Sequence, residues 1–456
     1  MIAEPPNLWF YDIKEGKPAN KVLVDGKYAV DGNVEHQPNG LLRAMDNWIY
    51  NAKSSKRYRK IKGQWVVQDT HFRGQWGISQ DDNGRLYYND NSTNLVGDYF
   101  SPGFGATNKS QRDLAGYTER TVSDNRVYPI RPTPGVNRGY TKGTLDDSLR
   151  LTNFTAACGP LIYRGNLFGE QYKFNAFVAE PSANLIKRNV LTESGLVVKG
   201  TQAYKGKEFL ASLDERFRPV NLYDGPDGAL YVLDMYRGII QHKTYVTPYL
   251  SEQFKRRDLS GPLNCGRIYK IVPKDKKPVS VVFSNETSKL VSLLGNANGY
   301  VRDKAQQMLI DKGDKAAIPL LERALNDAGK PLKVVHAMWV LEGLNALKTT
   351  ELLSLLKSQQ WPIRMQALSA LPSLINNSSY HHFKLALNEL LSSGDELSAP
   401  YLAYLAYYLK PFDESASNNF LASLAEKYPD NKYVTDAVLI TTERFELQIT
   451  DINYIS

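Results

Sequence analysis

Four side chains stand out for the chemistry they could perform, one histidine and three arginines. His36, in the run VEHQPNGLL, has an imidazole whose ordinary pKa lies close to neutrality, so it can take up a proton. Arg73, Arg216 and Arg218 carry planar guanidinium groups, which can hold a carboxylate through two parallel hydrogen bonds. Arg216 and Arg218 are two residues apart, and alternation along a strand puts such residues on one face. The residues alone leave alternatives open, because His36 could bond to a neighbouring sheet and Arg73 could form an ion pair between sheets.

A recurring strand pattern in the first 272 residues must position these side chains. Apolar strands, an Asp/Asn/Gly turn and a strand rich in Leu and Tyr begin at residues 39, 75 and 219. The turns 82–84 and 225–228 suit hairpins, because Asn and Gly tolerate positive φ. Repeats of about 40 to 50 residues that each hold a few strands indicate a β-propeller, and at most five blades can be counted. The stretch 97–150 is rich in Gly, Ser and Pro and predicts a long loop over one face.

One segment occurs twice at a second register of this repeat. The run IAEPPNLWFYD opens the chain and VAEPSANLIK returns at 178–187. Both consist of apolar residues, Glu-Pro, one or two small residues and Asn-Leu. We expect them to occupy the same place in two different blades.

The composition changes near residue 273, where VPKDKKPVS marks a charged, Pro-bounded linker over 273–284. Arg302, Lys333 and Arg364 then follow one another at intervals of 31 residues, each with a helical apolar stripe after it. This period predicts a HEAT/armadillo-like α-helical solenoid over 285–456. His336 falls inside one such helix, where a packed or surface histidine is expected rather than a metal ligand.

The overall composition bounds the function. With 42% hydrophobic and 23% charged residues the chain is globular, and its net charge of +8 is spread rather than concentrated, which argues against a nucleic-acid partner. The densest basic run, 53–60, predicts an exposed hairpin. No apolar run is long enough for a transmembrane helix, and no signal peptide is visible. Two cysteines, Cys158 and Cys265, are too few for a disulfide scaffold, and no Cys-x-x-Cys-His motif for covalent haem occurs.

The phrases AEPPNLWFYD, VEHQPNGLL, FTAACGPLIYRG, NAFVAEPSANLIKR and RPVNLYDGPDGALYVLDMYRG resemble the dehydrogenase-like propeller modules of large secreted bacterial proteins. These modules are related to the quinoprotein glucose/sorbosone dehydrogenases and are followed by HEAT repeats. The resemblance covers the propeller and, more loosely, the helical part. It implies a six-bladed ring, so we expect the chain to be truncated at its N-terminus and to lack the cytochrome c domain of its relatives.

The resemblance also implies roles for the four side chains. His36 would be the base that takes the proton of a sugar hydroxyl, with Arg73 beside it in the active site. Arg73, Arg216 and Arg218 would hold the carboxylates of pyrroloquinoline quinone, the cofactor that accepts the hydride.

Other positions depart from the family. Ser54-Ser55 stand where the family has the Gly-Asp that orients the base. NDNSTNLVGD replaces the metal-binding segment; residues 89–91 could offer oxygen ligands, but the pattern does not match. Lys14 interrupts a calcium-type loop near the start. Calcium is therefore unsupported, and the metal is unknown.

Two functions follow as expectations. The first is a quinoprotein-type dehydrogenase, or a fragment of one, that oxidises a sugar or alcohol and passes electrons to a separate acceptor. The second is a non-enzymatic module that binds a glycan on the propeller or a protein on the solenoid, which the altered surroundings of His36 favour. Relatives of this kind are exported, so we expect the periplasm or the cell surface.

Overall fold

The computed structural model describes residues 1–107 and 113–453, and within these ranges the strands form five antiparallel sheets. The first holds β1 (Ile2–Glu4), β2 (Asn7–Lys14) and β3 (Lys17–Asp25), and the second β4 (Asn39–Arg43), β5 (Ile49–Ala52), β6 (Lys56–Ile61) and β7 (Gln64–Asp69). The third holds β8 (Ile78–Gln80), β9 (Leu86–Tyr88), β10 (Leu95–Gly97) and β11 (Glu119–Val122). The fourth holds β12 (Cys158–Tyr163), β13 (Asn175–Glu180), β14 (Leu185–Ser194), β15 (Val197–Gln202) and the short β16 (Leu210–Ala211). The fifth holds β17 (Pro219–Asp224), β18 (Leu230–Asp234) and β19 (Arg267–Ile271).

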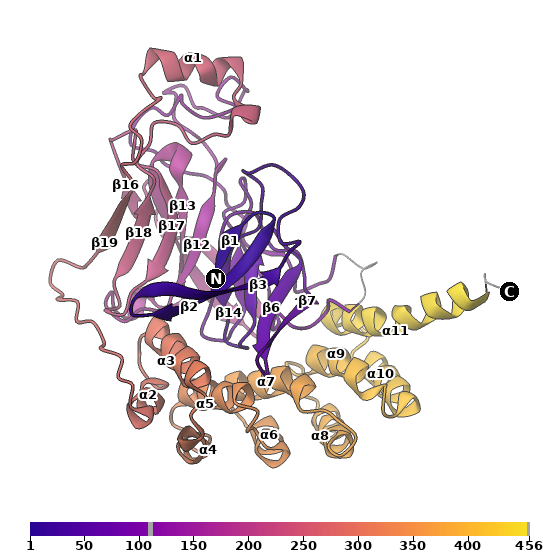
Figure 1. Ribbon diagram of the computed structural model, residues 1–456. Helices are drawn as coiled ribbons and strands as arrows, with labels where there is room; N and C mark the ends of the chain where they lie inside the picture. Colours follow the sequence, from indigo (N-terminus) through magenta and orange to yellow (C-terminus); the bar gives the residue numbers. More distant parts are fainter. Residues whose placement is uncertain (108–112, 454–456) are drawn as a thin grey trace.

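These sheets are the blades of a five-bladed β-propeller (Figure 1). Their innermost strands approach closely at glycines. A Cβ on Gly40 would lie 2.9 Å from the Cα of Gly77, and one on Gly77 would lie 3.1 Å from the Cα of Gly159. All three glycines also have positive φ, so no other residue fits there without strain.

The predicted hairpin turns and the repeated Glu-Pro segment are confirmed. The turn 81–85 joins β8 to β9 with Gly84 at φ +72°, and the turn 225–229 joins β17 to β18 with Gly228 at φ +74°. Glu4 ends β1 and Glu180 ends β13, and in both places the chain turns into the next strand of the same sheet. The stretch 97–150 is a loop only in part, because β11 lies within it and completes the third sheet.

The first and fifth sheets each leave one apolar face uncovered. On the first, Ile2 and Leu23 are 45% and 49% exposed and flank Trp9 in register. On the fifth, Ile268 is 71% exposed and lies opposite Leu233. Neighbouring blades elsewhere bury such residues against one another, so these two faces lack the packing that the other sheets have.

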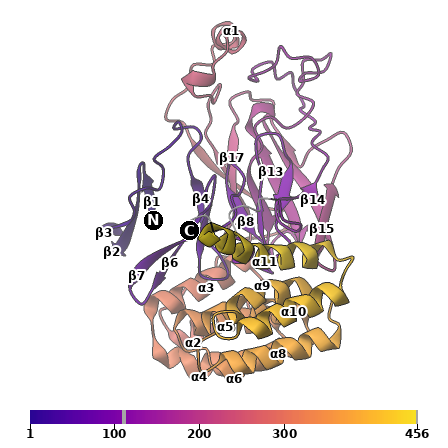
Figure 2. The same ribbon diagram turned by 90° about the vertical axis from the view of Figure 1, so that its right-hand side faces the viewer.

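The chain after the last strand is helical. Within the part of the chain that the structure describes, one helix, α1 (Pro248–Arg256), belongs to the propeller segment and ten follow it. They are α2 (Thr287–Leu293), α3 (Gly299–Lys312), α4 (Ile318–Ala324), α5 (Pro331–Gly343), α6 (Thr349–Leu356), α7 (Trp361–Ala370), α8 (Tyr380–Ser393), α9 (Ala399–Leu409), α10 (Glu414–Lys427) and α11 (Lys432–Asn453). Helices α3, α5, α7 and α9 form the layer next to the propeller, and α4, α6 and α8 lie behind it (Figures 1 and 2). Among the described residues no helix combines the length and the apolar character needed to cross a bilayer.

The helical layer covers the propeller face that carries the hairpin turns. Asn47 donates to the Trp339 carbonyl (2.8 Å), and Gln366 donates to the Asn83 carbonyl (2.7 Å). Apolar side chains of both parts share one core, in which Met45, Phe100 and Phe104 pack with residues of α5, α7 and α9. We call the opposite face, where β4, β8, β12 and β17 begin, the distal face; α1 projects beyond it (Figure 1).

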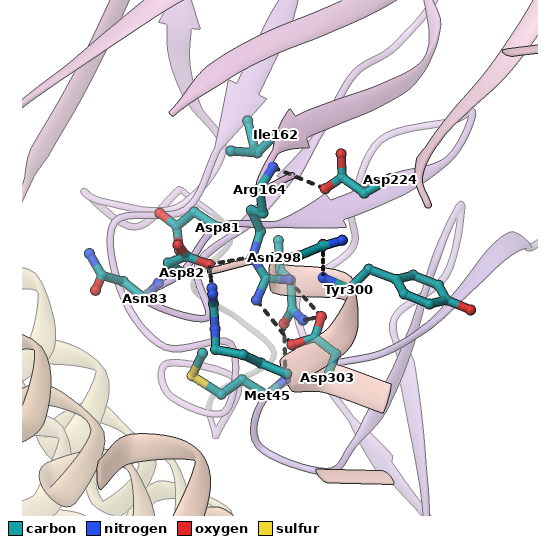
Figure 3. Close-up of polar contacts among 12 residues, drawn as sticks. Met45, Asp81, Asp82, Asn83, Ile162, Arg164, Asp224, Asn298, Tyr300 and Asp303 are labelled. Carbon is teal, nitrogen blue, oxygen red and sulfur yellow. Dashed lines mark hydrogen bonds and ion pairs between the residues drawn. The ribbon is translucent and has the colours of Figure 1, made fainter. Parts of the chain in front are cut away.

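Buried charges also join the two parts. Arg164 follows β12 and binds Asp82 through Nε (2.6 Å) and Asp303 of α3 through both Nη atoms (2.6 and 3.0 Å). Its backbone N–H donates to Asp224 (2.9 Å), so one residue links two sheets and a helix (Figure 3). His336 is fully buried nearby, with Nδ1 2.6 Å from Gln306, as expected for a packed histidine.

Candidate functional site on the distal face

His36 lies on the distal face, in the connection between β3 and β4. Its ring lies between those of Trp76 and Tyr245, with centroids 5.9 and 5.2 Å away. Nδ1 is 3.4 Å from the Tyr245 hydroxyl, which also accepts a hydrogen bond from Asn33 (2.6 Å). Nε2 has no hydrogen-bond partner among the described residues. With its proton on Nδ1, facing Tyr245, the imidazole would present a free lone pair at Nε2.

Glu35, the neighbour of His36, is bound by a segment that follows about two hundred residues later in the chain. Glu35 accepts hydrogen bonds from the side chain of Gln241 (2.8 Å) and the backbone of His242 (2.9 Å). The sequence analysis did not identify Glu35 or Tyr245. These contacts fix the ring from a segment that follows the fifth sheet.

Arg73 is 1% exposed, and all of its nitrogens have partners within the protein. Nε pairs with Asp98 (2.8 Å), Nη1 donates to the Thr70 hydroxyl (2.8 Å) and the His71 carbonyl, and Nη2 contacts the Pro102 carbonyl. The guanidinium therefore holds the loop before β8 against the third sheet, in the kind of ion pair left open above for this residue.

Arg216 and Arg218 precede β17 rather than lie in it, so strand alternation does not orient them. Arg218 is 4% exposed, and its three nitrogens donate to the carbonyls of Pro181, Arg237 and Gly238. Arg216 is half-buried and donates through Nη2 to the Asp258 carbonyl (3.0 Å). The two guanidinium groups thus have separate partners, and only that of Arg216 is exposed enough for a ligand to reach it.

These arginines, as arranged, do not fit a quinone with three carboxylates. Such a ligand needs guanidinium donors that are not already bound. The guanidinium groups of Arg73 and Arg218 are buried and donate to Asp98 and to backbone carbonyls. No reaction step is therefore derived through this cofactor.

A cavity of about 790 Å³ opens on the distal face between the second and third sheets. We call it the His71 cavity; its lining includes Lys53, Phe72, Gln75 and Asn89. Gln75 precedes Trp76, the residue whose ring touches His36, so the cavity and His36 flank the same short segment.

Two polar groups in this cavity wall determine which ligand suits it. His71 stacks on Tyr117 (4.0 Å) and its Nε2 is 3.1 Å from the Phe104 carbonyl. Burial, and secondarily Arg73, lowers the pKa of His71 to about 4, so the ring is neutral at pH 7. Asn89 is 0% exposed, and neither its Oδ1 nor its Nδ2 has a hydrogen-bond partner within residues 1–107 and 113–453. An unpaired buried amide costs about 1–3 kcal/mol, so a group that bonds to it gains that much.

Two of the three residues weighed above as oxygen ligands, Asp90 and Asn91, have protein partners instead. Asn91 accepts from the Trp76 indole (2.6 Å), and Asp90 accepts from the Ser92 backbone (2.8 Å). Across the described ranges, no three His, Cys, Asp or Glu side chains gather in a way that could hold a metal ion.

Comparison with known proteins gives one family and a distant structure. A crystal structure from Thermus thermophilus, described provisionally as an oxidoreductase (glucose dehydrogenase), matches 51% of this chain and 86% of its own at 15% identity and a TM-score of 0.26. No curated protein matches. The model of a family described as a domain of unknown function (DUF7133) matches residues 1–275, which is more than half of the chain, so the protein belongs to that family.

Proposed function

We propose that the distal face of the propeller binds a sugar or another polyhydroxylated alcohol in the His71 cavity. The observation that carries this proposal is the buried amide of Asn89 in the cavity wall, whose donor and acceptor both lack a hydrogen-bond partner among the described residues and which would turn toward the cavity to meet a ligand. A hydroxyl group can donate to Oδ1 and a second can accept from Nδ2. The neutral ring of His71 and the half-exposed ring of Phe72 at the rim suit an uncharged ligand with an apolar face.

Calorimetric titration with a panel of neutral monosaccharides tests the proposal. Asn89→Leu, which keeps the branching at Cγ and removes the donor and acceptor, should lower affinity at least tenfold, whereas Asn419→Leu on the exposed surface of α10 should not. Phe72→Ala tests the rim without touching a buried residue. Failure of a folded chain to bind any sugar, or unchanged affinity in both cavity variants, would refute the assignment.

A second candidate is oxidation of the bound alcohol, with His36 as the base. It is favoured by Nε2, which has no partner among the described residues while Tyr245 and Trp76 fix the ring. The hydride would need a separate acceptor, and because Arg73 and Arg218 bond to protein groups, titration of pyrroloquinoline quinone with and without calcium comes before any rate measurement. Sugar-dependent dye reduction should fall at least tenfold in His36→Gln and stay unchanged in His382→Gln, an exposed histidine of α8. Absence of quinone binding would leave the sugar-binding module as the function.

We also infer that the five sheets belong to a six-bladed ring and that the helices are HEAT-type repeats. The uncovered faces around Leu23 and Ile268 support a further blade. The 31-residue spacing of Arg302, Lys333 and Arg364, in α3, α5 and α7, supports the repeats.

Export to the periplasm or cell surface is part of the same proposal and rests on the sequence resemblance. Fractionation of the native host, with an antibody to this chain, tests it.

A further inference from the structure

A second cavity lies on the other side of the propeller, between the second sheet and the helices. Its volume is about 530 Å³, and we call it the Arg57 cleft. It lies in the interface that joins the two parts of the chain, a common place for ligand sites.

The basic run 53–60 supplies the charge of this cleft. The sequence predicts an exposed hairpin there, and β6–β7 is indeed a hairpin, but alternation along β6 divides its charges. Lys56 reaches Asp25 of the first sheet (2.8 Å), whereas Arg57 and Arg59 both line the cleft. The prediction of an exposed hairpin is therefore wrong for these two arginines.

Arg57 and Arg59 differ in their partners. Arg59 makes a two-pronged ion pair with Glu342 of α5 (2.9 and 2.6 Å), which neutralises it. Arg57 has no carboxylate within 4 Å of its nitrogens among the described residues. Its Nη1 donates to the Tyr50 hydroxyl (3.0 Å) and its Nη2 to Gln68 (2.8 Å), while Nε is buried without any partner.

The position of Arg57 is fixed before any ligand arrives. Its guanidinium carbon lies 4.2 Å from the centre of the Trp48 ring, a stacked cation–π contact. The nearest carboxyl group, Asp46, accepts instead from the Tyr50 hydroxyl (2.6 Å) and the Trp48 backbone (3.1 Å). Burial raises the pKa of Asp46, whereas the charge of Arg57 and the hydrogen bond from Tyr50 act in the opposite direction. A planar cation with spare donors therefore lines the cleft near Asp46, with no carboxylate among the described residues within salt-bridge distance of it.

We propose that the Arg57 cleft binds an anionic sugar, a sugar acid or a sugar phosphate, with Arg57 holding the acidic group. Guanidinium groups bind carboxylate and phosphate oxygens through short, charge-assisted hydrogen bonds. The far wall offers uncharged groups suited to hydroxyls, including Asn345, Ser373 and Asn376 from the helical part. The volume accommodates one sugar ring with its acidic substituent. This site is separate from the His71 cavity and does not depend on the function proposed for it.

Titration of the full chain carrying Asn89→Leu with glucuronate, glucose 6-phosphate and glucose tests the proposal, because this background lacks the neutral-sugar site proposed on the distal face. We expect at least one of the two anions to bind and glucose to bind at least tenfold more weakly; the stronger anion identifies a carboxylate or a phosphate ligand. Arg57→Gln should lower anion affinity at least tenfold, and Arg57→Lys should recover only part of it, because the ammonium lacks the planar fork. Arg126→Gln, at an exposed surface pair, is the matched control and should bind as the parent does.

A second variant guards against a folding defect in Arg57→Gln. Thr349→Trp, at the start of α6 on the opposite wall, leaves Arg57 intact and should fill the cleft. Each variant is first compared with the parent by circular dichroism and urea unfolding. Equal affinity for glucose and the anions, or anion binding that survives either cleft substitution in a folded chain, overturns the proposal. Asn89→Leu should leave anion binding unchanged, which separates this site from the distal face.

Discussion

Arg164 provides the sharpest test of how the propeller and the helices are held together. Its side chain is 7% exposed and binds Asp82 and Asp303 directly. Arg302 also contacts Asp82, so Asp82 keeps a cation when Arg164 is removed. Asp303 would be left without a cation, because its remaining basic neighbour within salt-bridge distance is His336, whose Nε2 is 4.0 Å away. Burial lowers the pKa of His336 to about 3, so that ring carries no charge at neutral pH.

We therefore expect Arg164→Met to destabilise the protein substantially. Removing one partner of a buried ion pair typically costs about 3–5 kcal/mol, since the other charge stays buried without compensation. Asp303 is 20% exposed, which places the expected loss near the lower end, about 3 kcal/mol. The exposed pair Arg126–Asp124 is the matched comparison, and Arg126→Met should cost much less than Arg164→Met.

Urea unfolding followed by circular dichroism measures the loss, and limited proteolysis of the joint between β19 and α2 reports whether the helices separate from the propeller. Asp303→Asn in the Arg164→Met background should recover part of the stability, because it removes the unpaired charge. The defect should also be larger at pH 8 than at pH 5, where Asp303 without Arg164 can take up a proton. A loss no greater than that of Arg126→Met, or no recovery in the double variant, would refute the reasoning.

Three further predictions follow from buried groups and close approaches. Burial raises the pKa of Asp224 to about 7 from its ordinary value of 3.8. Between these pH values the folded wild type therefore binds more protons than the unfolded chain, and its stability falls as pH rises. Asp224→Asn should remove about 2–3 kcal/mol of this fall in the free energy of unfolding between pH 5 and pH 8, measured by urea unfolding at both pH values. Gly77→Ala should destabilise by about 2–3 kcal/mol through both strain and contact with Gly159, whereas Gly63→Ala, with the same positive φ but open space, should cost about 1 kcal/mol; equal effects in thermal unfolding would contradict the close-approach argument. Leu23→Ser and Ile268→Ser should each leave the free energy of unfolding within about 0.5 kcal/mol of that of the parent, and each should reduce self-association in sedimentation experiments, since each removes an exposed apolar side chain.

Much of the fold was predictable because it depends on local patterns. The turns at Gly84 and Gly228 follow from residues that accept positive φ, and the helical part begins at Thr287, after the composition changes. The equivalence of Glu4 and Glu180 could be read from the repeat alone. β11 was not predicted, because it has only four residues and its partner β10 ends at Gly97, far before it in the chain.

The candidate site was less predictable, because burial of an arginine depends on partners that the local sequence does not contain. Arg218 is satisfied by the Pro181 carbonyl of another blade and by two carbonyls that follow β18. The sequence presents Arg57 as one of several basic residues in the run 53–60. The tertiary structure distinguishes it, because Glu342 of α5 pairs with Arg59 while Arg57 donates to the Tyr50 hydroxyl. Side-chain type predicted the chemistry available, and tertiary contacts decided which groups are free to perform it.

The second sheet separates the two proposed sites, and this separation makes them independent. The His71 cavity lies at the distal end of the sheet, where β7 leads into Thr70 and His71, while the Arg57 cleft lies against the helices. The segment 101–106 borders both sites, since Pro102 lines the cleft and Gly105 lines the cavity, but Asn89 and Arg57 have no hydrogen-bond partner in common among the described residues. Substitutions more than about 7–10 Å apart that share no partner act additively. The double variant Asn89→Leu/Arg57→Gln should therefore lose neutral-sugar and anion binding by the same factors as the two single variants, and a departure larger than about threefold would show that the two ends of the sheet are coupled.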